Sequence, residues 1–251
     1  MVLTVGVIWF SIGCDSRVEN ESRPQNGQDP NIPANALPTP TVPPLQSEIL
    51  DETNSKTDSP LGTFDFKNFT YPFPHGWQDR DSKEFTLVNG ARQMTEEKIG
   101  MSFLTKKYGD LTGDGDDEAL VILKVRTGGS AIPQLVYIFE WQGGEPNLLW
   151  YFRTGDRAAG GLKRIYANSG ELVVELYGRD RYIFSKMETS KIVGDEQQLC
   201  CPTHFTRTRY KREGKTFLLQ GDRLTYSLKD KKAEPVKNMN EKQLEEERGT
   251  K

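Results

Sequence analysis

The stretch QLVYIFEWQGGEPNLLWYFR, residues 134–153, decides the fold class of this chain. Its two apolar runs are separated by residues 143–146, Gly-Gly-Glu-Pro, which supply the positive φ angles and the break that a hairpin turn needs. In the first run Tyr137, Phe139 and Trp141 share one face, because successive side chains of a strand point to opposite faces. The stretch therefore predicts two antiparallel strands joined by a tight turn.

The same pattern continues on both sides of this hairpin. Short runs rich in Val, Ile, Phe, Tyr and Thr alternate with Gly, Asn and Asp turns, and the helical period is absent except near residues 95–99. The expected strands cover residues 64–71, 84–88, 101–108, 118–125, 134–141, 148–153, 162–167, 171–177, 181–185, 205–211, 217–220 and 223–228. We expect a mainly β domain over residues 61–229, with an antiparallel, hairpin-rich sheet closed or bent into a sandwich- or barrel-like single domain.

The first residues predict export. Residues 1–13, MVLTVGVIWFSIG, carry no charge and fit the apolar region of a signal peptide. They are shorter than the roughly 20 residues that span a bilayer. The run ends at Cys14 after the small residue Gly13, and the chain then turns polar, which resembles a bacterial lipobox. Ser11 departs from that pattern, which prefers Leu, and a buried strand with an incidental cysteine is the alternative.

The lipobox resemblance predicts a lipid on Cys14 and a bacterial cell-envelope location, at the periplasmic face or outer surface. Eight of the 14 prolines lie between Pro24 and Pro60. Residues 14–60 therefore predict a lipid-anchored cysteine followed by a disordered, Pro-rich tether. Residues 230–251 are rich in charge and predict a tail.

Composition and missing motifs narrow the functional classes. The net charge is −3 and no basic stripe is present, which disfavours nucleic-acid binding. The chain holds two histidines and contains none of the common hydrolase, metalloprotease or nucleotide-binding motifs. We therefore predict no catalytic residue, although paired-carboxylate glycosidase chemistry needs no local motif.

The sequence YGDLTGDGDDE, residues 108–118, predicts a calcium loop. Oxygen-bearing residues stand at alternate positions, and Gly115 allows a sharp turn, as in loops that wrap Ca²⁺. The predicted ligands are Asp110, Thr112, Asp114, Asp116 (through its carbonyl) and Glu118. An all-oxygen set without histidine indicates a structural ion rather than catalytic zinc. An acidic hairpin turn without an ion is the alternative.

A strand, rather than a helix, is expected directly after this loop. The loop followed by a strand resembles the Asp-rich loop of FG-GAP and VCBS-type blades. The resemblance covers about a dozen residues, and Thr112 stands where Asp or Asn is usual, which implies weaker affinity. The loop occurs once, so a propeller of repeated blades is not implied. Together, YGDLTGDGDDEALVIL, LLWYFRTGDRAAGGLKRIYA, LVVELYG and CCPTHFTRTRY resemble uncharacterised bacterial lipoproteins or secreted proteins. That resemblance implies export and the calcium loop but no activity.

Two further groups are candidate sites. Cys200 and Cys201 could form a strained vicinal disulfide, a redox switch, or a soft metal site with His204, or they could be two thiols beside a turn. Arg207, Arg209 and Lys211 alternate along one expected strand and form a candidate binding face for an anionic headgroup or glycan. A solvated strand face is the alternative.

Three Asp-Arg pairs follow glycines, and we interpret them as turns with weak surface pairing: Asp156-Arg157, Asp180-Arg181 and Asp222-Arg223. The functional hypothesis is an exported, lipid-anchored protein whose calcium-stabilised β domain binds an unknown protein or glycan without catalysis. A cell-envelope glycan hydrolase and a periplasmic enzyme inhibitor are the alternatives.

Overall fold

A computed structural model describes residues 48–74, 83–94, 99–129, 131–184, 191–194 and 201–239. All of them fall in one compact unit, Val42–Lys251. Within the described residues the only helix is the short 3₁₀ turn η1 (Pro60–Gly62), and the regular structure is otherwise antiparallel strands. The prediction of a mainly β, antiparallel domain is therefore confirmed.

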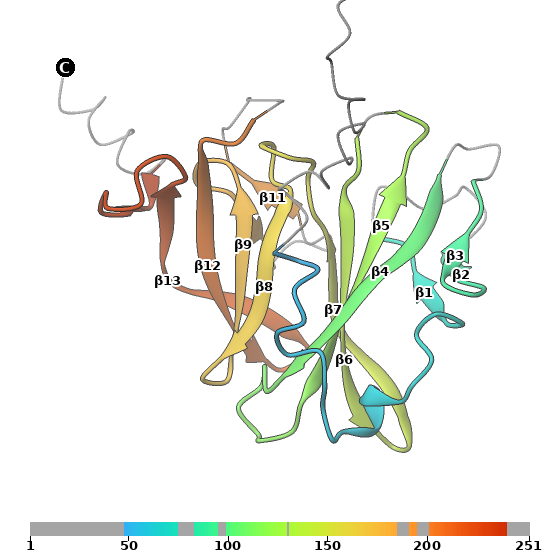
Figure 1. Ribbon diagram of the computed structural model, residues 1–251. Coiled ribbons are helices and arrows are strands. Elements are labelled where there is room, and N and C mark those ends of the chain that lie inside the picture. Colours follow the sequence, from blue (N-terminus) through green and yellow to red (C-terminus); the bar gives the residue numbers. More distant parts are fainter. Residues whose placement is uncertain are drawn as a thin grey trace, which may run out of the picture. The chain divides into compact units, whose positions relative to one another are not determined.

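The strands form two five-stranded sheets in succession along the chain (Figure 1). The first sheet is a meander in which every neighbour in space is a neighbour in sequence. In spatial order its strands are β3 (Ala91–Arg92), β4 (Gly100–Gly109), β5 (Glu118–Arg126), β6 (Gln134–Gln142) and β7 (Glu145–Arg153).

The second sheet is a meander interrupted once, by a small hairpin. In spatial order its strands are β14 (Val236–Lys237), β13 (Thr216–Ser227), β12 (His204–Glu213), β9 (Glu171–Tyr177) and β8 (Leu162–Asn168). The inserted hairpin is β10 (Tyr182–Phe184) with β11 (Lys191–Val193), and a further hairpin, β1 (Thr70–Pro72) with β2 (Glu84–Thr86), precedes the first sheet. Neither five-stranded sheet closes on itself in the described part of the chain, so the barrel-like form is not confirmed.

The two large sheets share one apolar core. Alternate residues of β5, β6 and β7 pack against alternate residues of β8, β9, β12 and β13. The largest members are Trp150 and Phe152 from the first sheet and Tyr210 and Phe217 from the second, and the rings of Trp150 and Phe217 stack with centroids 5.3 Å apart. These contacts follow from the period-2 alternation, which places one apolar face of each sheet against the other.

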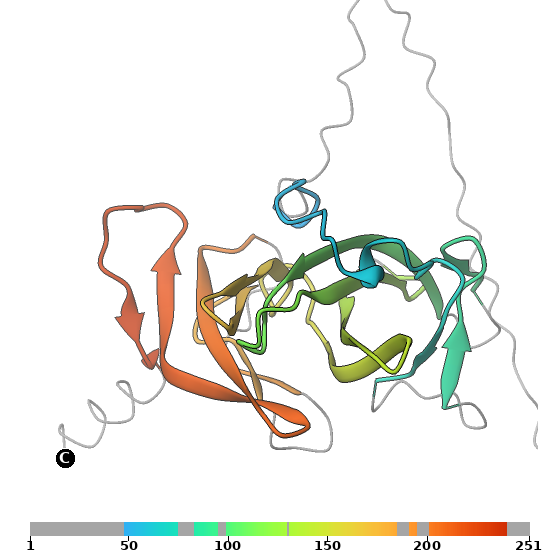
Figure 2. The ribbon, with the colours of Figure 1, turned by 90° about the horizontal axis from the view of Figure 1, so that it is seen from below.

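The opposite face of the first sheet carries a second, aromatic core. Residues of η1, the following turn, β1 and β2 pack against the outward side chains of β4, β5 and β6. Figure 2 shows β1 and β2 on the side of the first sheet away from the second sheet. Because β5 is covered on both faces, its residues 118–123 are all buried. This is the physical reason for the unbroken apolar run Ala-Leu-Val-Ile-Leu in that strand.

Residues 48–54, the segment before η1, contact both β4 and β8 (Figure 1, blue). We call the boundary between these two strands, and so between the two sheets, the seam. Ile49 is buried in the shared core, and Glu48 forms an ion pair with Lys163 of β8. Asp51 pairs with Lys107 of β4. The predicted tether ended at residue 60, but the packed unit includes residues from 48 onward, so that boundary lies too far along the chain.

The expected strands correspond to strands of the structure with two exceptions, and three short strands were not expected. Residues 64–69 form turns, in which the Asp65 carboxylate accepts the backbone N–H of Lys67 at 3.1 Å and the side-chain amide of Asn68 at 2.7 Å. The expected strands 217–220 and 223–228 are one bulged strand, β13. β3, β11 and β14 were not predicted. Residues 95–98 of the expected helical turn lie outside the described residues. Part of the predicted tail, Val236–Lys237, forms β14.

Candidate functional site

The Asp-rich loop connects β4 to β5, and Gly109 and Glu118 face each other at its base. Gly113 and Gly115 have φ angles of 82° and 94°, a left-handed conformation that other residues rarely adopt. A Cβ on Gly170 would lie 2.8 Å from the Cα of Gly113. The loop therefore lies against the β8–β9 turn, with backbone close to backbone.

Hydrogen bonds within the loop hold its aspartates. The Asp110 carboxylate accepts the backbone N–H groups of Thr112 and Gly115, each at 3.2 Å, and also that of Gly113. The Asp114 carboxylate accepts the N–H of Asp116 at 3.0 Å. These bonds to carboxylates satisfy the exposed backbone donors of a tight loop.

Glu118 is the buried acid of the loop. Its Oε2 accepts the backbone N–H of Leu111 at 2.7 Å, and the residue is 1% exposed. Burial raises the pKa of Glu118 to about 7; the nearby charges of Asp114 and Asp110 add to the rise, and the Leu111 hydrogen bond opposes it. The side chain of Thr112 adds a buried hydroxyl for which the described structure provides no hydrogen-bond partner.

The donor chemistry of the loop suits a hard cation, since carboxylates, a hydroxyl and backbone carbonyls are oxygen ligands. The orphaned Thr112 hydroxyl fits the same expectation, because buried polar groups normally have a partner. However, no group of three acidic, His or Cys side chains converges on one point among the described residues. The acidic side chains among the predicted ligands thus share one loop without converging on one point, and calcium stays a prediction.

The candidate binding face lies on β12. Arg207, Arg209 and Lys211 alternate with buried residues, so they occupy one face as expected. They differ in their availability. Arg207 is held by Glu175 with its Nε at 2.7 Å from Oε1, Arg209 lies 3.5 Å from Glu171, and Lys211 is exposed.

A buried charge network under this face was missed by sequence reasoning. The Glu175 carboxylate, 1% exposed, contacts Lys163 at 2.9 Å and Arg207 at 2.7 Å. Lys163 also lies over the ring of Phe205, with its Nζ 4.3 Å from the centroid. Burial tends to lower the pKa of Arg207, but the hydrogen bond and charge of Glu175 outweigh it and the pKa is raised. The sequence signal for this network was Glu175 itself, a charged residue between apolar neighbours in an expected strand.

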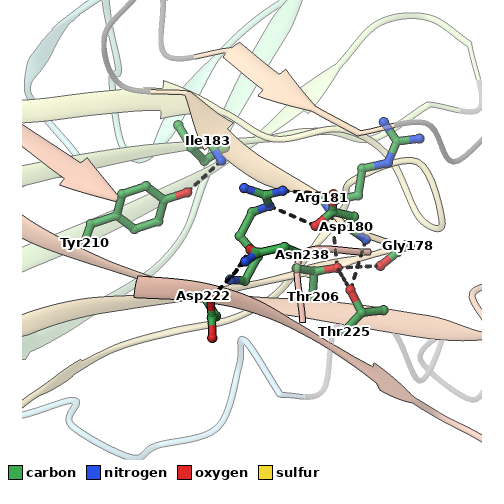
Figure 3. Close-up of polar contacts among 10 residues, drawn as sticks. Gly178, Asp180, Arg181, Ile183, Thr206, Tyr210, Asp222, Thr225 and Asn238 are labelled. Carbon is green, nitrogen blue, oxygen red and sulfur yellow. Dashed lines mark hydrogen bonds and ion pairs between the residues drawn. The ribbon is translucent and has the colours of Figure 1, made fainter. Parts of the chain in front are cut away.

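A second polar network joins the turn between β9 and β10 to β12 and β13 (Figure 3). Asp180 is buried and binds the Arg223 guanidinium through two contacts, Nε–Oδ1 at 2.8 Å and Nη2–Oδ2 at 3.2 Å. Thr206 donates to the carbonyl of Gly178 at 3.1 Å. The interpretation of the Asp-Arg pairs as weak surface pairing was wrong for these two residues, because the partners come from different turns and are desolvated.

Two predicted residues fall outside the described part of the chain. Cys14 is one, so lipidation is untested. Cys200 is the other, so the pairing of Cys200 with Cys201 is also untested, and Cys201 itself is exposed. His204 does not face a metal group among the described residues; its Nδ1 lies 2.9 Å from the Thr203 hydroxyl.

No family model, curated protein or solved structure matches this chain. Within the described residues, no helix has the length and apolar character needed to cross a membrane.

Proposed function

We propose that this chain is an exported, lipid-anchored bacterial envelope protein whose β domain is stabilised by Ca²⁺ and serves a non-catalytic binding or structural role. The observation that carries the calcium part is the pairing, in one loop, of a buried acid with a buried hydroxyl that has no hydrogen-bond partner. A divalent cation would provide a partner for both groups, because it favours the charged form of the Glu118 carboxylate and takes oxygen ligands such as the Thr112 hydroxyl.

The loop residues have defined roles in this proposal. Asp110, Thr112, Asp114 and Glu118 would supply side-chain oxygens, and Asp116 its carbonyl. Bound Ca²⁺ supplies two positive charges that offset the repulsion among the carboxylates. Because the loop contacts the β8–β9 turn, binding would also stabilise the seam between the two sheets.

Calorimetric titration of the full chain with Ca²⁺ and with Mg²⁺ tests the ion site. We expect saturable binding of Ca²⁺, weaker binding of Mg²⁺, and loss of both in Asp114→Ala. Glu145→Gln is the matched control, because Glu145 is an exposed acid at another hairpin turn. Absence of Ca²⁺ binding to the wild-type chain at millimolar concentration would contradict the proposal.

The anchor requires a separate experiment in bacterial cells. We expect the wild-type chain in the membrane fraction, with a diacylglycerol-modified Cys14 detected by mass spectrometry of the N-terminal peptide. Cys14→Ser should shift the protein to the soluble or uncleaved precursor form. An unmodified Cys14 in a mature wild-type protein would remove the lipid anchor from the account.

A further inference from the structure

A pocket of about 380 Å³ lies between β10 and β13, far along the chain from the Asp-rich loop. It is partly open to solvent and combines aromatic, aliphatic and charged side chains. Its lining consists of Tyr182, Ile183, Phe184, Glu213, Leu218, Leu219, Gln220 and Arg223.

The pocket arises at a bulge in β13. Arg209 of β12 pairs with Gln220, while Arg207 pairs with Leu224, so the three residues 221–223 face the single residue Thr208. The extra residues begin at Gly221, whose φ of 64° other residues rarely adopt. Bulges bend a strand locally and re-aim side chains, often beside functional sites. Here the bulge accompanies the inward placement of Arg223 next to β10.

The wall formed by β10 and the turn before it is held in place by hydroxyl groups (Figure 3). The Ile183 N–H donates to the Tyr210 hydroxyl at 2.7 Å, the Arg181 N–H to Thr206 at 3.1 Å, and the Asp180 N–H to Thr225 at 3.2 Å. Side chains of the second sheet thus replace part of the ladder that a short strand lacks. The pocket wall is therefore preformed rather than assembled by a ligand.

The pocket offers an apolar surface to solvent. Tyr182 and Phe184 stand two residues apart on β10 and share one face, whereas Ile183 points into the shared core. Phe184 is 36% exposed, which makes it one of few large apolar side chains at the surface of the described residues. An aromatic ring at the mouth of a pocket favours a ligand with an apolar body.

The charges of the lining are unequal. Arg223 is engaged, because Asp180 binds two of its nitrogens and its guanidinium lies 4.3 Å from the centroid of Tyr182. Glu213 is exposed, and none of the ion pairs between described residues includes its carboxylate. The charge left to meet a ligand is therefore negative, and it lies in the same lining as two aromatic rings.

We propose that this pocket binds a small amphipathic cation, an ammonium or guanidinium group on an apolar body. The carboxylate of Glu213 pairs with the cation, and the rings of Phe184 and Tyr182 pack against the apolar body. The inference goes beyond the proposed calcium-stabilised envelope role and uses none of the loop residues, so either can fail alone.

A matched series of three probes tests the charge requirement on the full chain: 2-phenylethylammonium, 2-phenylethanol and 3-phenylpropanoate, followed by NMR titration. We expect the cation to bind about fivefold more tightly than the alcohol, and the anion to bind most weakly. The chemical-shift changes should centre on β10 and on residues 218–223. Equal affinities, binding elsewhere, or no binding of the cation at millimolar concentration would overturn the proposal.

Two variants separate the contributions. Glu213→Gln should remove the preference for the cation over the alcohol while leaving the alcohol affinity unchanged. Phe184→Ala should weaken both by a similar factor. Both residues are exposed, and Glu52→Gln provides an exposed control carboxylate on another part of the fold, with no expected effect. A preference for the cation that persists in Glu213→Gln would exclude the assigned partner.

Discussion

The two five-stranded sheets have similar meander topologies, but they differ in what packs against their faces. The first sheet is packed on both faces, against the second sheet on one side and against the aromatic cluster of η1, β1 and β2 on the other. The second sheet has one apolar face. Its other face carries cations paired with Glu175, a carboxylate that is almost fully buried.

The difference in covering is related to where the candidate sites lie. The central strands β5 and β6 of the first sheet have polar residues only near their ends, because both of their faces are covered and desolvated polar groups need partners. The cationic row on β12 and the pocket beside the β13 bulge belong to the second sheet. The Asp-rich loop joins β4 to β5 of the first sheet, but it lies against the β8–β9 turn of the second. All three candidate sites therefore lie on the second sheet or in contact with it.

The largest effect is expected in the aromatic cluster. Phe139→Ala removes a ring that packs against Phe66, Phe69 and Tyr71, and should lower the free energy of unfolding by about 3–5 kcal/mol. Phe205→Ala, on the open face of the second sheet, should cost only about 1 kcal/mol through its stack with Tyr226. Equal losses of unfolding free energy for the two variants, measured by chemical denaturation, would contradict the view that only the first sheet is packed on both faces.

The next effect tests the buried charges of the second sheet. Glu175→Gln leaves Lys163 and Arg207 without their shared carboxylate, and should cost about 3 kcal/mol. Glu171→Gln is a control on the same strand and face, because its pair with Arg209 at 3.5 Å is partly exposed to solvent; we expect less than about 0.5 kcal/mol. If both substitutions have the same small effect in urea denaturation, the network is not a structural element.

A smaller effect is expected at the seam between the sheets. Lys107 donates to the carbonyls of Asp51 and Thr53 and to the Asp51 carboxylate, and it is 5% exposed. Lys107→Met removes these bonds and should lower the free energy of unfolding by about 2 kcal/mol.

A pH effect accompanies this contact. Burial alone would raise the pKa of Asp51, but its hydrogen bond and charge interaction with Lys107 outweigh it, so the pKa is lowered. This contribution is therefore present above the ordinary carboxyl pKa of 3.8 and is lost as the pH falls through the lower folded pKa. Lys215→Met, at an exposed turn, should show neither change, and a seam variant as stable as this control would contradict the role of residues 48–54.

The central strands could be predicted from sequence because their pattern is local. Residues 171–177 were expected as a strand, and β9 has those bounds, since alternating apolar residues are bounded by Asn-Ser-Gly and by Gly178. The bulged strand β13 was divided in two, because Gly221 and Asp222 are turn formers by local criteria. Only pairing with β12 on both sides of the bulge makes them part of one strand.

The partners of charged residues could not be predicted, because they depend on register. Lys163 and Glu175 are 12 residues apart, and Asp180 and Arg223 are 43 apart. For the candidate site, the alternating oxygens of residues 110–118 were visible in the sequence. The burial of Glu118 and the contact of Gly113 with Gly170 were not, because both depend on how the second sheet packs against the loop.

The proposed calcium stabilisation is tested most directly by thermal melts of the full chain in millimolar Ca²⁺ and in EDTA, with Asp114→Ala in parallel. At a free Ca²⁺ concentration ten times the dissociation constant, we expect about 1.4 kcal/mol of stabilisation, or a rise in Tm of about 3–6 °C. This rise should be absent in Asp114→Ala, because the substitution removes one of the proposed ligands. Identical melting temperatures for the wild-type chain in Ca²⁺ and in EDTA would contradict it and leave the loop as an acidic turn.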